Sequence, residues 1–318
     1  MIFEILFAIL KGVLLLAFVS LTTMFLVYLE RKISGHFQVR FGPMRVGFHG
    51  SFQLFADMFK LLMKEDIIPT LCDKWVFMIA PVMIFIPAYL LFTIIPIAPG
   101  FVIQTLDVGL LYLLGITGLT VLAIMMAGWS SNNKYALIGG FRSVAQIISY
   151  EVPLVLSLLP VIMIADSFSL TKIVEAQGAL PFIFIQPLAF FIYFTASIAE
   201  INRAPFDMPE AESELVSGYN VEYSGMRFAI FFFAEYMNMF AVCAIATVLF
   251  LGGWHGPILP PAVWFFLKSY FLVFILMWIR WTFPRLRVDQ LMGFCWKRLF
   301  PLAIINLIIT AIWMGLHG

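Results

Sequence analysis

Carboxyl groups inside apolar stretches are the residues of this sequence best suited to chemistry. Glu235 lies in FFFAEYMNMF, Glu151 in ISYEVPLVL, and Glu200 closes a third apolar stretch. An ionisable side chain within a membrane costs several kcal/mol unless it is paired, so each one suggests a functional role. Burial favours the neutral form of a carboxyl, which suits a proton relay. We predict that these three glutamates relay protons; the alternative for Glu235 is a structural carboxyl hydrogen-bonded to another span.

The residues around Glu151 and Glu200 add two local predictions. Pro153 cannot donate a hydrogen bond to the carbonyl of Ser149, which predicts a free backbone acceptor and a water-containing cavity beside Glu151. The alternative is a simple helix start. Arg203 follows Glu200 at the i,i+3 spacing of a helical ion pair, although a solvated helix end has the same pattern.

An acidic connection follows Glu200 in the stretch AEINRAPFDMPEAESELVSGYNVEYSG, residues 199–225. Its acids are Glu200, Asp207, Glu210, Glu212, Glu214 and Glu222. In an extended chain the three glutamates spaced by two share one face. A solvated loop is the alternative, but apolar residues such as Phe206 and Tyr219 favour partial order. We predict a loop that funnels protons to the membrane carboxyls.

The elements that position these residues are membrane spans. The 318 residues are 63% hydrophobic and 12% charged, with a mean hydropathy of +1.01, which excludes an ordinary soluble domain. A bilayer core about 30 Å thick needs about 20 apolar residues per helix. The sequence predicts an all-α polytopic membrane protein with eight such spans, at about 3–29, 76–97, 107–128, 146–166, 182–201, 227–251, 263–281 and 299–316. The first is expected to be a retained span rather than a cleaved signal peptide, because it is too long and Glu30, Arg31 and Lys32 follow it.

The basic residues predict the orientation. All but three (Lys11, Lys172 and Lys268) of the 19 Lys and Arg residues fall in the odd-numbered loops. Cytoplasmic loops carry this excess. We therefore expect both termini on the outer side and inner loops at about 30–75, 129–145, 202–226 and 281–298, in a single membrane domain over 1–318.

An amphipathic helix is predicted in the first inner loop. Phe52, Phe55, Phe59 and Leu62 recur at helical spacing in SFQLFADMFKLLMKED, with Asp57 among the polar residues between them. Such a helix is too short to span and suits the membrane interface. It is either a surface anchor packed on neighbouring helices or the lip of an entrance for a lipid-soluble ligand.

Cofactor motifs are missing from the sequence. Cys72, Cys243 and Cys295 lie far apart without C-x-x-C pairing, which argues against a zinc or iron–sulfur site made by this chain alone. The four histidines lack ligand spacing, and no P-loop or G-x-G-x-x-G occurs. We expect metal and nucleotide chemistry to belong to partner chains.

Three long motifs carry a family resemblance: ERKISGHFQVRFGP, SNNKYALIGGFRSVAQIISYEVP and AEINRAPFDMPEAESELVSGYNVEYSGMRF. They closely resemble the H subunit of proton-pumping NADH:quinone oxidoreductase, respiratory complex I, whose mitochondrial counterpart is called subunit 1. The length, the spans and the inner loops agree as well, so the resemblance covers the whole chain. It implies a subunit that joins the membrane arm to the hydrophilic arm, lines the quinone chamber and couples quinone reduction to proton translocation.

The resemblance also implies roles for individual residues. The relay would consist of Glu151, Glu200 and Glu235 together with the acidic loop, Asp207, Glu210, Glu212, Glu214 and Glu222. Chamber or portal positions would be Arg31, Asp57, Arg203, Phe228 and Phe232, and the portal helix adds Phe55 and Phe59. Quinone would be the substrate, with FMN and iron–sulfur clusters in partner subunits. Those partners would be hydrophilic subunits on the inner face and small membrane-arm subunits alongside, with no role for nucleic acid.

Two other classes share some of these features. A stand-alone proton-coupled transporter also uses intramembrane carboxyls and proline-broken helices, but the acids and large loops here gather toward one face. A subunit of a related membrane-bound hydrogenase-type complex would share the membrane part with another electron donor, but the acidic loop and portal helix are expected where quinone enters. The expected location is a bacterial inner membrane, with the mitochondrial inner membrane as the alternative.

Overall fold

The apolar segments of the chain fold as helices. The computed structural model describes residues 2–178, 180–208 and 216–317. In these ranges the only strand-like pairing is an isolated bridge between Ala98 and Phe101, which confirms the all-α class. The helices are α1 (Ile2–Phe37), α2 (Gln53–Met63), α3 (Lys74–Leu91), α4 (Gly109–Ser130), α5 (Lys134–Ala165), α6 (Leu170–Ala176), α7 (Phe182–Ile185), α8 (Pro187–Glu200), α10 (Gly225–Phe250), α11 (Pro261–Thr282), α12 (Val288–Phe294) and α13 (Phe300–His317), with short helical turns η1 (Phe48–Gly50), η2 (Gly218–Asn220) and η3 (Cys295–Leu299).

Seven helices of the described residues are long and apolar enough to cross a membrane. They correspond to all the predicted spans except the fifth, 182–201, and make the chain a multi-pass membrane protein. The fifth span is divided into the four-residue α7 and the shorter apolar helix α8. The side on which the termini lie stays a prediction.

The division between α7 and α8 has a local cause. Pro187 occupies the first turn of α8, and Gln186 before it leaves the helical conformation, as residues preceding proline tend to do. The Gln186 side chain is held by α13: its amide donates to Thr310 Oγ1 at 2.9 Å, and its carbonyl accepts from Asn306 Nδ2 at 3.1 Å. The break is therefore pinned by a buried polar cluster.

Two predicted inner loops are largely helical. The segment 129–145 was expected to be a loop, but α4 ends at Ser130 and α5 already begins at Lys134. Asn133 caps α5, because its side chain accepts a hydrogen bond from the backbone N–H of Tyr135. Likewise α12 and the π-helical turn η3 occupy the end of the segment 281–298 and run directly into α13.

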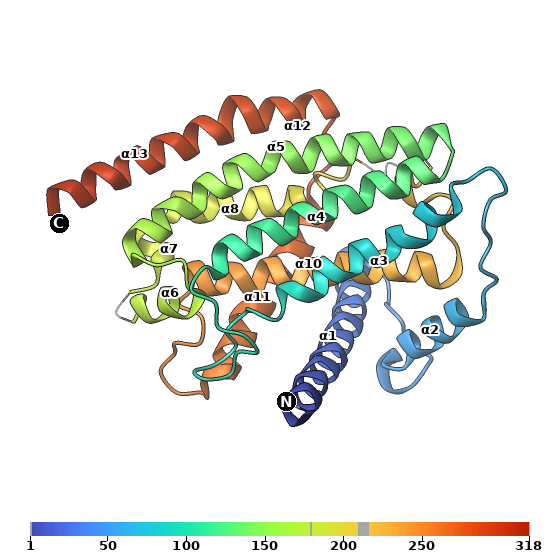
Figure 1. Cartoon of the computed structure of the whole chain (residues 1–318), viewed down its shortest axis with the longest axis horizontal. Coiled ribbons are helices and arrows are strands. Elements are labelled where there is room, and N and C mark those ends of the chain that lie inside the picture. Colours follow the sequence, from blue (N-terminus) through green and yellow to red (C-terminus); the bar gives the residue numbers. More distant parts are fainter. Residues whose placement is uncertain (1, 179, 209–215, 318) are drawn as a thin grey trace.

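Helix α10 lies at the centre of the bundle. Every residue from Met239 to Phe250 is buried, and α10 contacts α1, α3, α8 and α11. Figure 1 shows α3, α4, α5 and α8 running side by side, with α13 along α5 and α1 at an angle below them. The second half of α10 is thus enclosed by helices distant in sequence, and Glu235 lies in the first half, where burial is less complete.

The carbonyl that Pro153 leaves free is not open to water. Helix α5 continues through this proline, and the thiol of Cys295 in η3 donates to the carbonyl of Ser149 at 3.1 Å. The prediction of a free acceptor beside Glu151 was therefore wrong, because a distant side chain satisfies it. The π-helical turn brings this cysteine to the required place.

Small residues let α4, α5 and η2 approach one another closely. A Cβ on Gly128 of α4 would lie 2.9 Å from the carbonyl oxygen of Ala136, and one on Gly139 of α5 would lie 2.7 Å from the Cα atom of Gly218. Small residues allow such backbone approach between membrane helices. The second contact fixes η2, and with it the end of the acidic connection, against α5.

Candidate functional site

A buried ion cluster joins α1, α10 and α11 to the turn that follows α8. The Arg203 side chain is 2% exposed, and its Nη1 lies 3.0 and 3.1 Å from the two carboxylate oxygens of Glu30 at the end of α1. Its Nε lies 2.5 Å from Oε1 of Glu235 in α10. One guanidinium thus bridges two carboxyls from separate helices.

The cluster also contains Arg280 and Tyr236. Arg280, near the end of α11, forms a second ion pair with Glu30, and the Tyr236 ring lies 4.4 Å from the Arg203 guanidinium carbon, a cation–π distance. With both glutamates ionised, the four charged groups sum to zero. Burial lowers the pKa of Arg203, but the carboxylates of Glu235 and Glu30 outweigh this effect and raise it above its usual value. Arg203 therefore stays charged.

Helix α5 holds the turn that carries Arg203. Gln146 donates its side-chain amide hydrogens to the carbonyls of Ala199 (2.7 Å) and Phe206 (2.6 Å), on either side of the turn. Asn202 has a left-handed φ of 53° and donates to Ser143 Oγ at 3.0 Å. These contacts turn the chain at the end of α8 and direct Arg203 toward α1 and α10.

The pairing of Arg203 differs from the sequence-based expectation. The i,i+3 spacing suggested an ion pair with Glu200, but α8 ends at Glu200 and the left-handed turn takes Arg203 out of helical register. The ion pairs of Arg203 are with Glu30 and Glu235 instead. A spacing rule for one helix fails where the helix stops between the two residues.

Glu30 and Arg280 are site residues that the sequence reasoning did not single out. Both lie at the ends of apolar spans, where they were counted only as flanking charges. A signal was available, since Glu30 stands in the ERK motif directly after an uninterrupted apolar span. Only tertiary packing shows that the side chain turns inward and is 6% exposed.

Aromatic rings line one face of α10 beside the cluster. The rings of Phe228 and Phe232 stack with centroids 6.3 Å apart, and those of Phe232 and Tyr236 are 4.9 Å apart. Residues four apart share a helix face, so the three rings form a row that ends at the ring over Arg203. The structure thus brings two of the predicted quinone-binding phenylalanines to the ion cluster.

The predicted amphipathic helix is present as α2, in contact with both α1 and α10. Asp57 pairs with Arg31 and accepts from Gln53 Nε2 at 3.1 Å. The opposite face is open: Phe55 and Phe59 are exposed, the latter to 57%. This chain does not cover that face within the described residues, so α2 is held by the face that carries Gln53, Leu54 and Asp57 and presents Phe55 and Phe59 outward.

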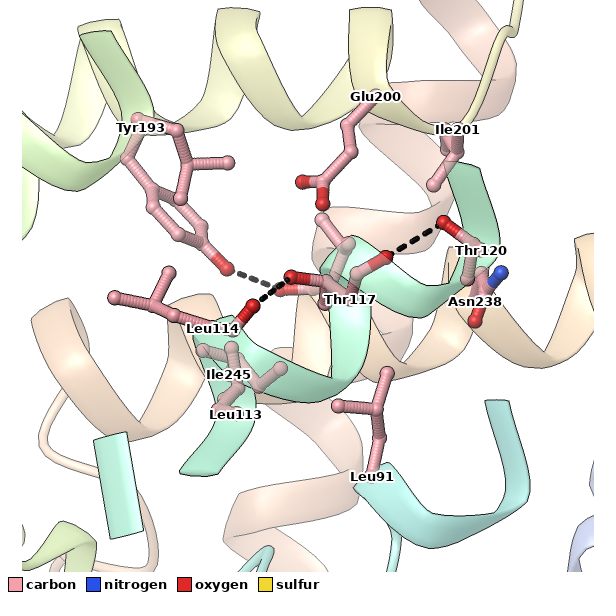
Figure 2. A pocket seen from close by; sticks show the side chains of 12 residues that line it. Leu91, Leu113, Leu114, Thr117, Thr120, Tyr193, Glu200, Ile201, Asn238 and Ile245 are labelled. Atoms are coloured by element: carbon pink, nitrogen blue, oxygen red, sulfur yellow. Dashed lines mark hydrogen bonds between the residues drawn. The ribbon is translucent and has the colours of Figure 1, made fainter. Parts of the chain in front are cut away.

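A small enclosed cavity lies beside Glu200. Figure 2 shows the Glu200 carboxyl pointing toward Thr117, with Tyr193 and Asn238 nearby. The cavity of about 40 Å³ has room for a few water molecules. Thr120 and aliphatic side chains of neighbouring helices complete the lining. The sequence predicted a water-containing cavity beside Glu151, but Glu151 is not among the residues that line this one.

Asn238 links this cavity to the ion cluster. It follows Glu235 by three residues, so the two side chains share a face of α10. Its Oδ1 is buried, and no described residue donates to it, while its side chain lines the cavity that Glu200 also lines. Glu151 lies on α5 within electrostatic range of Glu200. Glu235 and Asn238 share a face of α10, Asn238 and Glu200 share a cavity, and Glu200 and Glu151 lie within electrostatic range of each other.

The acidic connection is only partly described. Glu210, Glu212 and Glu214 lie outside the described residues, whereas Asp207 lies close enough to Glu235 to act on it electrostatically. Glu222 is placed elsewhere, because it accepts a hydrogen bond from Asn133 Nδ2 at 2.7 Å in the turn between α4 and α5. The described acids of the connection therefore do not converge on one point.

No group of three or more His, Cys, Asp or Glu residues in the described ranges could hold a metal ion. The fold and the site together define a class: a polytopic helical membrane protein with a buried ion cluster, a row of aromatic rings beside it on α10 and further buried carboxyl groups nearby.

Comparisons with known proteins show the family to which the chain belongs. The family model described as NADH dehydrogenase matches residues 10–311. The H subunit of the NADH-quinone oxidoreductase of Dehalococcoides mccartyi is 51% identical over 299 residues, covering 94% of this chain and 84% of that protein. An H subunit from Geobacter metallireducens is 50% identical over 332 residues (97% and 95%), and the one from Geobacillus kaustophilus is 50% identical over 307 residues (95% and 92%). The chain belongs to the family of NADH-quinone oxidoreductase H subunits.

Proposed function

We propose that this chain is a membrane subunit of a proton-translocating NADH:quinone oxidoreductase. In this proposal the quinone binds next to the ion cluster, and its reduction changes the charge of the cluster and thereby the protonation of the buried carboxyls. One observation carries this proposal: Glu235 pairs directly with Arg203, while Asn238 one turn further along α10 lines the Glu200 cavity. A change of charge at the cluster therefore reaches the cavity through a single helix face.

The quinone would approach between α1, α2 and α10. The outward aromatic face of α2, with Phe55 and Phe59, suits an isoprenoid tail, and the ring row of Phe228 and Phe232 suits an aromatic head group. The ion pair of Asp57 with Arg31 fixes α2 to α1 at this point.

The cluster can hold and move protons at defined atoms. Reducing a quinone takes two electrons and two protons; the electrons would come from FMN and iron–sulfur clusters of partner subunits. Protonation of Glu235 at Oε1 removes the partner of Arg203 Nε and leaves one excess positive charge among Glu30, Arg203 and Arg280. Because unbalanced buried charge is costly, the cluster should favour a compensating proton shift toward Glu200 and Glu151.

The acidic connection would supply protons from the inner aqueous side. Asp207 acts at the cluster, and we assign Glu210, Glu212 and Glu214 to the same supply. Glu222 would instead hold the connection against the α4–α5 turn. The proposed partners are hydrophilic subunits of the complex at the inner face and small membrane-arm subunits alongside, and the proposed location is the bacterial inner membrane.

The decisive experiment neutralises Glu235. Membrane vesicles containing the complex with Glu235→Gln are assayed for NADH-driven quinone reduction and for proton uptake with a pH-sensitive dye. We expect normal assembly and loss of most of the proton uptake per quinone reduced. Glu175→Gln, on the exposed side of α6, is the matched control and should behave as wild type. Wild-type pumping by assembled Glu235→Gln complex would remove Glu235 from the relay.

A further inference from the structure

A second site lies at the opposite end of α11 from the ion cluster. A groove of about 600 Å³ opens between α7, the loop after α10 and the first half of α11. Lys268 lies twelve residues before Arg280, so the two are about 18 Å apart along the helix axis at 1.5 Å per residue. The groove volume falls within the range of ligand-binding pockets, and neither the quinone approach nor the carboxyl line reaches it.

Most of the groove lining is apolar and open. Trp264, Leu267, Lys268 and Phe271 occur at the i, i+3, i+4 and i+7 positions of one face of α11. Phe184 of α7, 74% exposed, faces the same groove. Leu267 and Phe271 therefore offer hydrocarbon contacts on a surface of α11 that would face lipid.

The end of the groove nearest the loop is polar and positively charged. Lys268 Nζ donates to the carbonyls of Leu251 (2.7 Å), Gly253 (3.2 Å) and His255 (2.7 Å). The lining contains no carboxylate, and none of the described ion pairs involves Lys268, so the polar partners of its ammonium group among the described residues are backbone carbonyls. The buried indole N–H of Trp264 finds no acceptor among the described residues.

We propose that this groove binds one anionic phospholipid, with its phosphate near Lys268 and an acyl chain along Leu267, Phe271 and Phe184. The arrangement pairs a cation at one end with hydrocarbon further along the helix, which is the order of charge and apolarity in a lipid at the membrane surface. The long 3.2 Å contact of Lys268 with Gly253 is the one that the phosphate would replace. Trp264 supplies a second donor at the same end.

The test uses the assembled complex in vesicles of equal parts phosphatidylglycerol and phosphatidylcholine. Trace phosphatidylglycerol or phosphatidylcholine with a diazirine in one acyl chain is added and photolysed, and the cross-linked peptides are mapped. We expect peptides spanning 183–184 and 264–271 to be labelled about fivefold more by the phosphatidylglycerol probe, the preference expected of one cation near the membrane surface.

Variants separate the contributions of charge and shape. Lys268→Met should abolish the preference, whereas Lys172→Met, an exposed lysine of α6, should keep it. Leu267→Trp fills the groove without touching the lysine and should reduce labelling by both probes. Equal labelling of wild type by the two probes would mean ordinary lipid contact. That result, a preference that persists in Lys268→Met, or absent labelling because a protein subunit covers the groove would each overturn the proposal.

Discussion

Neutralising Glu30 tests whether charge balance governs the ion cluster. In Glu30→Gln, Arg203 and Arg280 lose a shared partner, Arg203 keeps its ion pair with Glu235, and the ion pair of Arg280 with Glu30 is lost. Breaking a buried ion pair costs about 3–5 kcal/mol because a charge is left unpaired. Since the Arg280 side chain is 27% exposed and water can screen it, we expect the lower end, about 3 kcal/mol.

The double variant Glu30→Gln/Arg280→Gln should be more stable than Glu30→Gln alone. It leaves Arg203 and Glu235 as a neutral pair, so it should recover at least about 1 kcal/mol of the loss, even though it carries one more substitution. Changes of about 1–2 kcal/mol alter the abundance of a protein several-fold. The amount of intact complex on native gels, before and after graded heating of solubilised membranes, therefore measures both effects.

Glu4→Gln is the control, because Glu4 is an exposed residue near the other end of α1. It should leave the abundance and heat resistance of the complex unchanged. The reasoning is refuted if Glu30→Gln matches this control, or if the double variant is less stable than the single one. In the second case the hydrogen bonds of Arg280 would matter more than the net charge of the cluster.

Three further variants probe the approach, the proline-freed carbonyl and the close helix contact. Phe55→Asp should slow reduction of long-tailed quinones more than of short hydrophilic ones, measured as kcat/KM for each. The control Ile258→Asp, in an exposed loop, should affect neither. Equal slowing of both quinones would assign α2 to anchoring. Cys295→Ala should destabilise the complex by about 1–3 kcal/mol by leaving a buried carbonyl unpaired, and Cys295→Ser, which keeps a donor, should lose less in the same heating assay. Gly139→Ala should cost about 1–3 kcal/mol through overpacking and lower the yield of assembled complex, while Gly115→Ala, with open space around its Cβ position, should assemble normally.

The sequence predicted the spans well because each depends on a local property. Length and hydropathy define α3, α4, α10, α11 and α13 without knowledge of their neighbours. The fifth span was harder, since its division depends on Pro187 together with polar groups of α13, more than a hundred residues away. The helical extension of α5 before Glu151 was missed because a polar, basic stretch can be helical as readily as it can form a loop.

The site was predictable in its residue types and not in its pairings. Glu235 and Arg203 were recognised as candidates, and they do meet, but through a left-handed turn at Asn202 that no spacing rule anticipates. Glu30 and Arg280 reach the cluster from helices at opposite ends of the sequence. The thiol of Cys295 had no signal at all, because its role exists only once η3 packs against α5.

The length of α5 gives it a mechanical property. Its 32 residues extend for about 48 Å at 1.5 Å per residue, well beyond a hydrocarbon core of about 30 Å. Lys134 at its start lies seventeen residues, or about 25 Å, from Glu151. A rigid rod pivoting at Glu151 would therefore turn a tilt of about 5° into a displacement of about 2 Å at Lys134, and the reverse. Helix α5, which holds the Arg203 turn, would in this way couple a tilt at Glu151 to a displacement at Lys134.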